Sequence, residues 1–204
     1  MNFQRRPLLT APRYMPLWGM AIGAVGGLVF WLGAQLWPAS IAVVLSMLAM
    51  AFLSADYEVA TPATTQSRVG FVLVLLLKYN VLTALSAASL PFALPANLAL
   101  GVIMIAGQAA GWALRASALA SPLPPGSKPV SHGDLGVVLV IGFAPAALIG
   151  LPGLIGLAAA IVARIAFTAY LKRRSTLAAA ELDSIRQLTE VCFYLGALAA
   201  WGYI

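Results

Sequence analysis

The chain has 204 residues, of which 62% are hydrophobic and 9% are charged, and its net charge is +6. A soluble domain carries about 25% charged residues, so this composition excludes an ordinary soluble fold. A single cysteine and a single histidine exclude a disulfide framework or a zinc cluster of Cys and His. The positive charge does not indicate nucleic-acid binding, because the basic residues lie in connectors next to apolar stretches, where they contact anionic lipid.

Seven apolar stretches fill most of the chain, and each is predicted to be a membrane-spanning helix. An apolar span needs about 20 helical residues, and the stretches are continuous rather than alternating with a period of two, which favours helices over a barrel. In chain order they are Pro16–Leu36, Ala39–Ser54, Val69–Ser89, Ala96–Ala120, Leu135–Gly150, Leu151–Leu171 and Ile185–Ile204. The second and fifth are short, so we expect them to tilt, to end within the membrane or to form tight hairpins with their neighbours.

The predicted fold is therefore all-α: a polytopic helical membrane protein with about seven transmembrane helices in a single integral membrane domain, residues 1–204. The multiply charged connectors all follow even-numbered stretches or precede the first. Their basic residues are Arg5, Arg6, Arg13, Arg68, Lys128, Lys172, Arg173 and Arg174. Positive loops stay cytoplasmic, which predicts a cytoplasmic N-terminus in a bacterial inner membrane. The predicted cytoplasmic parts are residues 1–14, 55–68, 121–134 and 172–184.

The first stretch contains two G-x-x-x-G steps, formed by Gly19, Gly23 and Gly27. Such steps let two helix backbones approach closely in lipid. We expect tight packing inside the protein rather than dimerisation, although a homo- or hetero-oligomer stays open as an alternative.

Four ionisable residues lie within or near the ends of apolar stretches: Lys78, Arg115, Arg164 and Glu190. A charge in mid-membrane costs roughly 2.5 to 3.5 kcal/mol, so it usually faces the bundle interior and has a partner. Lys78 lies ten residues beyond Arg68, about 15 Å deeper along a helix. One interpretation is structural, with Glu190 paired to Lys78 or Arg164. The other is a cationic pocket, open to the cytoplasm, that receives a phosphate-bearing substrate.

Three stretches in order resemble one known family. Residues 15–23 read MPLWGMAIG, Ser67-Arg68-Val69-Gly70 precedes a long apolar run to Lys78, and Lys172-Arg173 opens a segment that ends at Glu190 and Val191. Their order and spacing are similar to the cobalamin synthase family, the adenosylcobinamide-GDP ribazoletransferases. These integral membrane enzymes join a lower-ligand nucleoside to activated cobinamide.

The resemblance implies a phosphate-bearing corrinoid substrate, a Mg²⁺ cofactor and a set of site residues at the cytoplasmic face. The implied substrate-binding residues are Ser67, Arg68, Lys78 and Arg164. The implied catalytic acids are Glu58, Glu181 and Glu190. The implied magnesium ligands are Asp56, Glu58 and Glu181.

The chain departs from the family at its acidic motifs. Where the family has a His-Leu-Asp-Gly-Leu-Ala-Asp loop that binds magnesium, residues 58–64 read EVATPAT, without either aspartate. Gln66 replaces the aspartate before the Ser-Arg element, and residues 179–181 read AAE in place of a Thr-Gly-Asp motif. Magnesium prefers hard oxygen ligands, commonly carboxylates, so these departures predict lost or altered activity.

Three functions stay open at this point. The first is a divergent transferase of the cobalamin synthase type. The second is a non-catalytic membrane scaffold or partner subunit that keeps the helical bundle. The third is an unrelated small transporter or membrane assembly factor in which Lys78 and Glu190 line a path.

Overall fold

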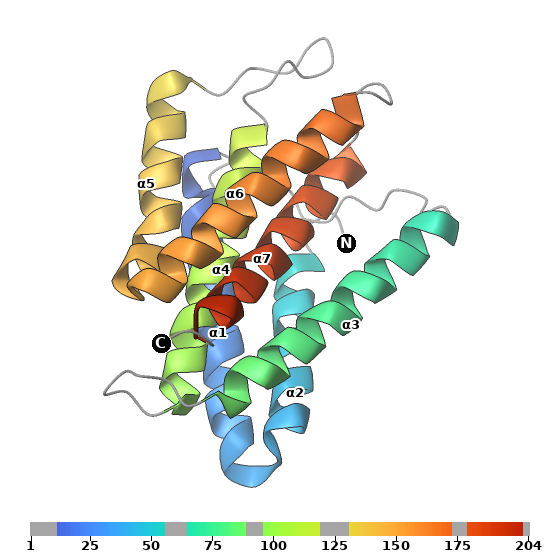
Figure 1. Ribbon diagram of the computed structural model, residues 1–204, viewed down its shortest axis with the longest axis vertical. Coiled ribbons are helices and arrows are strands. Elements are labelled where there is room, and N and C mark those ends of the chain that lie inside the picture. Colours follow the sequence, from blue (N-terminus) through green and yellow to red (C-terminus); the bar gives the residue numbers. More distant parts are fainter. Residues whose placement is uncertain (1–11, 56–64, 89–95, 119–130, 173–178, 202–204) are drawn as a thin grey trace, which may run out of the picture.

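A computed structural model describes residues 12–55, 65–88, 96–118, 131–172 and 179–201. Over these residues the protein is a bundle of seven α-helices, preceded by a short 3₁₀ turn, η1 (Pro12–Tyr14), which confirms the predicted all-α class (Figure 1). The helices are α1 (Met15–Leu36), α2 (Ala39–Ala55), α3 (Thr65–Ala87), α4 (Ala96–Ala118), α5 (His132–Leu148), α6 (Leu151–Lys172) and α7 (Ala179–Trp201).

Several helices are suited to a bilayer by their length and composition. Helix α1, residues Leu98–Ala118 of α4 and residues Leu151–Leu171 of α6 are long and apolar enough to cross a membrane, and Ala39–Ser54, Val72–Ala87 and Gly133–Leu148 are shorter apolar helices. The bundle also exposes large apolar side chains, including Val72, Leu73, Leu76 and Leu77 on α3 and Val162 and Ile165 on α6. Exposed apolar side chains in this number fit contact with lipid. The multi-pass membrane fold is thus supported, and the cytoplasmic position of the N-terminus remains a prediction.

Helix α4 is the centre of the bundle. It packs against α1, α5 and α7, and every residue from 106 to 118 is buried. Figure 1 shows α4 behind α6 and α7, with α1 alongside it. Helices α1, α3, α5, α6 and α7 therefore assemble around α4, and a polar side chain in its buried part must find a partner inside the protein.

Glycines bring α1 and α4 into backbone contact. A Cβ atom added to Gly23 would lie 2.6 Å from Ile105 Cα, and one added to Gly27 would lie 2.8 Å from Gly101 Cα. The third glycine of the series, Gly19, faces α4 in the same way, against Trp112. Both G-x-x-x-G steps therefore serve packing within one chain, as expected from the sequence.

The two short helices form tight hairpins with their neighbours, which was one of the three expectations for them. Trp37 and Pro38 alone separate α1 from α2, and Ile149 and Gly150 separate α5 from α6. Gly150 has φ of 78°, a left-handed conformation that glycine adopts without steric cost.

Helices α3, α5 and α7 each begin earlier than the apolar stretch that predicted them. For α5 the cause is visible: the Ser131 hydroxyl accepts a hydrogen bond from the Asp134 backbone N–H at 3.1 Å, an N-cap that starts the helix at His132. Helix α7 begins at Ala179, six residues before the predicted apolar stretch. Polar residues thus continue these helices beyond their apolar portions.

Candidate functional site

Several buried polar or charged side chains line a cavity between α2, α3, α4 and α7. Its volume of about 70 Å³ is enough for a few water molecules. The lining residues are Met47, Met50, Ala51, Ser54, Val74, Leu75, Lys78, Gln108, Arg186, Gln187, Glu190 and Val191. The lining residues fall in the second half of α2 and near the middle of α3, α4 and α7. The cavity therefore lies near mid-height of these helices.

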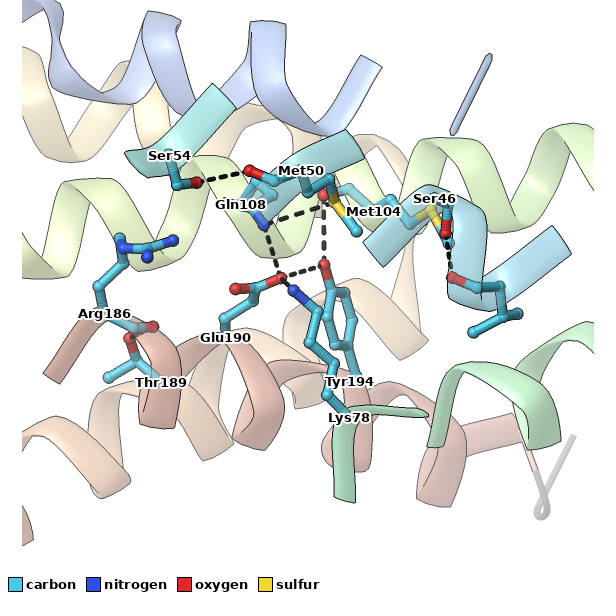
Figure 2. Close-up of polar contacts among 11 residues, drawn as sticks. Ser46, Met50, Ser54, Lys78, Met104, Gln108, Arg186, Thr189, Glu190 and Tyr194 are labelled. Atoms are coloured by element: carbon cyan, nitrogen blue, oxygen red, sulfur yellow. Dashed lines mark hydrogen bonds and ion pairs between the residues drawn. The ribbon is translucent and has the colours of Figure 1, made fainter. Parts of the chain in front are cut away.

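Three donors from three helices converge on one carboxylate oxygen in this cavity (Figure 2). Lys78 Nζ on α3 forms an ion pair with Glu190 Oε1 on α7. The same oxygen accepts hydrogen bonds from Gln108 Nε2 on α4 and from Tyr194 Oη on α7, each at 2.8 Å. Glu190 is 2% exposed and Lys78 is 8% exposed. Since buried charges are tolerated only when paired and hydrogen-bonded, these contacts explain how both residues lie inside the bundle.

Neighbouring atoms hold these donors in place. Lys78 Nζ lies 5.9 Å from the centre of the Tyr194 ring, and Gln108 Nε2 lies 3.5 Å from Met50 Sδ. Tyr194 Oη is also 3.4 Å from the Met104 carbonyl oxygen, but it has one proton and donates it to the nearer Glu190. Gln108 Oε1 is buried and has no hydrogen-bond partner within the described part of the chain.

A pair of glycines on α4 makes room for these α7 side chains. A Cβ atom added to Gly107 would overlap the Tyr194 ring, and one added to Gly111 would lie 3.2 Å from the Arg186 carbonyl oxygen. Because neither glycine has a side chain, α7 approaches α4 closely enough for Glu190 to reach Gln108 and for the Tyr194 ring to lie against Gly107.

A second polar cluster lies nearer the start of α7. Arg115 Nη2 is 3.0 Å from Asp183 Oδ1. The guanidinium carbons of Arg115 and Arg186 lie 4.9 Å and 5.1 Å from the Trp112 ring centre, so each cation interacts with the indole. Burial raises the pKa of the Asp183 carboxyl, and the positive charges of Arg115 and Arg186 oppose that shift. Arg186 also lines the cavity, which therefore has two positive side chains and one negative side chain.

The structure brings two of the predicted site residues together. Of the two partners considered for Glu190, it shows Lys78, which confirms that pairing. Arg164, predicted to bind substrate, lies on α6 and is not among the residues that line the cavity. Ser67 and Arg68 belong to the first turn of α3, and Glu181 to that of α7, but their side chains lie outside the described residues. Asp56 and Glu58 lie outside them altogether.

The carboxylates that the structure describes do not fit a magnesium site. Asp134 accepts a hydrogen bond from the Ser131 hydroxyl at 2.9 Å, Asp183 pairs with Arg115, and Glu190 pairs with Lys78. Within the described ranges no group of three or more His, Cys, Asp or Glu residues lies together. Each of these acids is already engaged by a donor or a cation, whereas Mg²⁺ requires several oxygen ligands converging on one point.

Sequence reasoning missed three residues of the site: Gln108, Arg186 as a cavity residue, and Tyr194. Two signals could have indicated them. Tyr194 follows Glu190 by four residues, which places both on one face of a helix. Gln108 is a polar residue in an apolar stretch, directly after Gly107, and a polar side chain beside a glycine in a membrane helix commonly marks contact with another helix.

The similarity of the chain to known proteins is local. The adenosylcobinamide-GDP ribazoletransferase of Leptothrix cholodnii is 48% identical to it over 46 residues, which are 22% of this chain. The match spans 17% of the length of that ribazoletransferase. No protein-family model matches the chain, and no solved structure matches it.

Proposed function

We propose that this chain is a membrane-embedded relative of the adenosylcobinamide-GDP ribazoletransferases that binds a phosphate-bearing corrinoid ligand and has lost or altered transferase turnover. The local match of 46 residues supports the relationship. So does the order of the three resembling stretches along the sequence. Both observations concern only parts of the chain, and we propose the ligand and the activity on this basis.

The positive charge of the cavity is the main support for a phosphate-bearing ligand. Lys78 and Arg186 contribute two positive charges and Glu190 one negative charge, so the lining side chains have a net charge of +1. A partly enclosed, positively charged cavity concentrates anions, and Arg and Lys are the usual phosphate-binding side chains. A ligand with a phosphoryl group fits this balance.

The missing and already paired acidic residues support lost or altered turnover. Displacement of a phosphate ester requires neutralisation of developing negative charge, which metal ions commonly supply. Residues 58–64 lack the aspartates of the family motif, and the described carboxylates Asp134, Asp183 and Glu190 have other partners. We therefore invoke no Mg²⁺-dependent step. We expect the chain to bind the corrinoid ligand even if transferase turnover is lost.

An assay in membranes tests both halves of the proposal. Membranes containing this chain are compared with membranes containing the Leptothrix cholodnii ribazoletransferase, with and without Mg²⁺, for binding of adenosylcobinamide-GDP and for formation of the joined product. We expect binding in both preparations and product in the second. Product formation by this chain at the rate of the reference enzyme would disprove loss of turnover. Absence of saturable binding would disprove the ligand class.

A second candidate, a non-catalytic scaffold, is favoured by the neutralisation of Lys78. Its ammonium group already has a carboxylate partner, and Glu190 accepts two further hydrogen bonds, so the network is satisfied without a ligand. Under this reading the double variant Lys78→Met/Glu190→Leu keeps every function of the chain. A transporter is less well supported, because the residues of α7 from 195 to 201 are apolar or glycine and offer no polar continuation beyond Tyr194.

A further inference from the structure

We infer that Lys78, Gln108 and Tyr194 form an oxyanion-binding site that the chain's own Glu190 occupies at rest, and that a ligand phosphoryl group replaces the Glu190 carboxylate on binding. The phosphoryl identity of the ligand rests on the proposed function. The site and its internal occupant rest on the contacts of the described residues.

The three donors Lys78, Gln108 and Tyr194 converge on a single oxygen of Glu190. Glu190 Oε1 has three donors, and none of the hydrogen bonds or ion pairs seen among the described residues involves Oε2. A carboxylate that served only to neutralise Lys78 would need one contact, whereas a set of donors aimed at one oxygen is the arrangement that stabilises an oxyanion. The donors come from α3, α4 and α7.

The two neutral donors, Tyr194 and Gln108, are buried among packed helices. Tyr194 is completely buried, and its ring fits against Gly107 of α4. Gln108 is 1% exposed, on the most deeply buried helix of the bundle. Packing of the surrounding helices, rather than the carboxylate, thus fixes the two neutral donors. A site held in this way is preorganised for a second anion of similar geometry.

Arg186 provides a second partner for the displaced carboxylate. It precedes Glu190 by four residues on α7, a spacing at which two side chains are neighbours, and both residues line the same cavity. In the view of Figure 2, the Glu190 carboxylate lies between Lys78 and Arg186. The rotation of one side chain can therefore transfer the carboxylate from Lys78 to Arg186 without movement of a helix.

Charge balance favours the exchange. At rest the cavity has a net charge of +1, from Lys78, Arg186 and Glu190. A bound phosphoryl group with one negative charge brings the total to zero, with Lys78 paired to the ligand and Arg186 paired to Glu190. The exchange therefore leaves each of these charges with a partner, as buried charges require, while Asp183 also acts electrostatically on Arg186. Gln108 Oε1, buried without a partner, can accept a hydrogen bond from water that enters with the ligand.

Calorimetric titration of the purified chain in detergent with inorganic phosphate, at constant ionic strength, tests the exchange. The variant Glu190→Gln keeps the size of the side chain but removes the competing charge. We expect it to bind phosphate about tenfold or more tightly than the unmodified chain, because like charges in one site repel strongly. Adding Lys78→Met to this variant should abolish the gain. Phosphate binding by folded Glu190→Gln that is no tighter than that of the unmodified chain would overturn the inference.

A pair of arginine variants tests the transfer of the Glu190 carboxylate to Arg186 without changing Lys78, Gln108 or Tyr194. These variants provide the test if Glu190→Gln does not fold. Arg186→Gln removes the proposed second partner of the carboxylate, so phosphate binding should weaken severalfold. Arg115→Gln is the matched control, since Arg115 also contacts Trp112 but does not line the cavity. Equal effects of the two variants would overturn the role of Arg186.

The probes separate this inference from the proposed function. Phosphate binding by Glu190→Gln together with no binding of adenosylcobinamide-GDP by the unmodified chain would support the exchange and disprove the proposed ligand. Binding of adenosylcobinamide-GDP that is unaffected by Lys78→Met, by Glu190→Gln and by Arg186→Gln would support the proposed ligand and overturn the exchange.

Discussion

The two sides of α4 use glycine for different purposes. On the side of α1, Gly23 and Gly27 bring the backbones of the two helices together, and the nearest atoms belong to the backbone of Ile105 and Gly101. On the side of α7, Gly107 faces the aromatic ring of Tyr194, and a buried ion pair lies beside it. The first contact is an apolar seam, and the second encloses the cavity.

The difference shows that spacing of small residues does not by itself decide what a membrane helix contact does. Glycines at intervals of four lower the distance between helices in both cases. The side chains opposite them then decide the outcome. Backbone opposite glycine gives tight packing, whereas Tyr194 and Glu190 opposite glycine give a polar site. Changes to the two faces of α4 should therefore differ in what they disturb.

The largest expected effect comes from removing one charge of the buried pair. Glu190→Leu leaves Lys78 uncompensated inside the bundle and should lower the free energy of unfolding by about 3 to 5 kcal/mol. The double variant Lys78→Met/Glu190→Leu should recover most of this loss, because an apolar pair can replace a buried ion pair at little cost. The measurement is denaturant-induced unfolding in mixed micelles. Equal losses of unfolding free energy in Glu190→Leu and in the double variant would show that the loss does not come from breaking the Lys78–Glu190 ion pair.

The apolar side of α4 should be the next most sensitive. Gly23→Ala places a methyl group against the Ile105 backbone, which cannot move away locally, so we expect a loss of about 1 to 3 kcal/mol in unfolding free energy. Gly70→Ala is the matched control, because a Cβ atom there would have no neighbour within 4 Å. Ligand and phosphate binding should be unchanged in folded Gly23→Ala. A binding defect would mean that the two faces of α4 are coupled.

Gly107→Ala should lower the free energy of unfolding less than Gly23→Ala does, but it should weaken phosphate binding. Its new methyl group meets a side chain rather than backbone, and the Tyr194 ring can shift, so the expected loss is about 1 kcal/mol. The shift moves the phenol away from Glu190 Oε1 and should weaken phosphate binding by Glu190→Gln in the double variant. Titration calorimetry of Glu190→Gln with and without Gly107→Ala measures this. Undiminished binding would separate the glycine from the polar site.

The smallest expected effect concerns one hydrogen bond. Tyr194→Phe removes the phenol donor and keeps the ring against Gly107. The lost hydrogen bond lies within α7, and Lys78 and Gln108 still contact Glu190, so we expect a loss of about 0.5 kcal/mol, the lower end of the usual net contribution of a hydrogen bond. Unfolding in micelles should detect a loss of this order. A loss as large as that of Glu190→Leu would indicate that the phenol, rather than Lys78, is the main partner of the carboxylate.

The fold was largely predictable from the sequence because apolar stretches and proline- or glycine-containing connectors mark helices and turns strongly. The Lys78–Glu190 pair was also within reach, since an uncompensated charge in lipid demands a partner. Gln108 and Tyr194 could be recognised as polar residues at helix contacts, but their partners could not, because a neutral polar side chain in an apolar helix does not indicate which helix it faces. The start of α7 was placed six residues too late because its first turns carry Glu181 and Asp183, which an apolar pattern excludes. The predicted magnesium acids Asp56, Glu58 and Glu181 remain predictions.

The contact between α1 and α4 has a consequence for how the protein is made. Gly23 and Ile105 are about 80 residues apart, and at 5 to 20 residues per second a ribosome needs roughly 4 to 16 s to cover that distance. During that interval the glycine groove of α1 has no protein partner, and lipid chains or an insertion chaperone must cover it. Arrival of α4 then closes the groove, whereas Gln108 and Arg115 on α4 meet their partners Glu190 and Asp183 only after α7 has been made. Biogenesis is therefore vulnerable first until α4 covers the groove, and then until α7 joins α4.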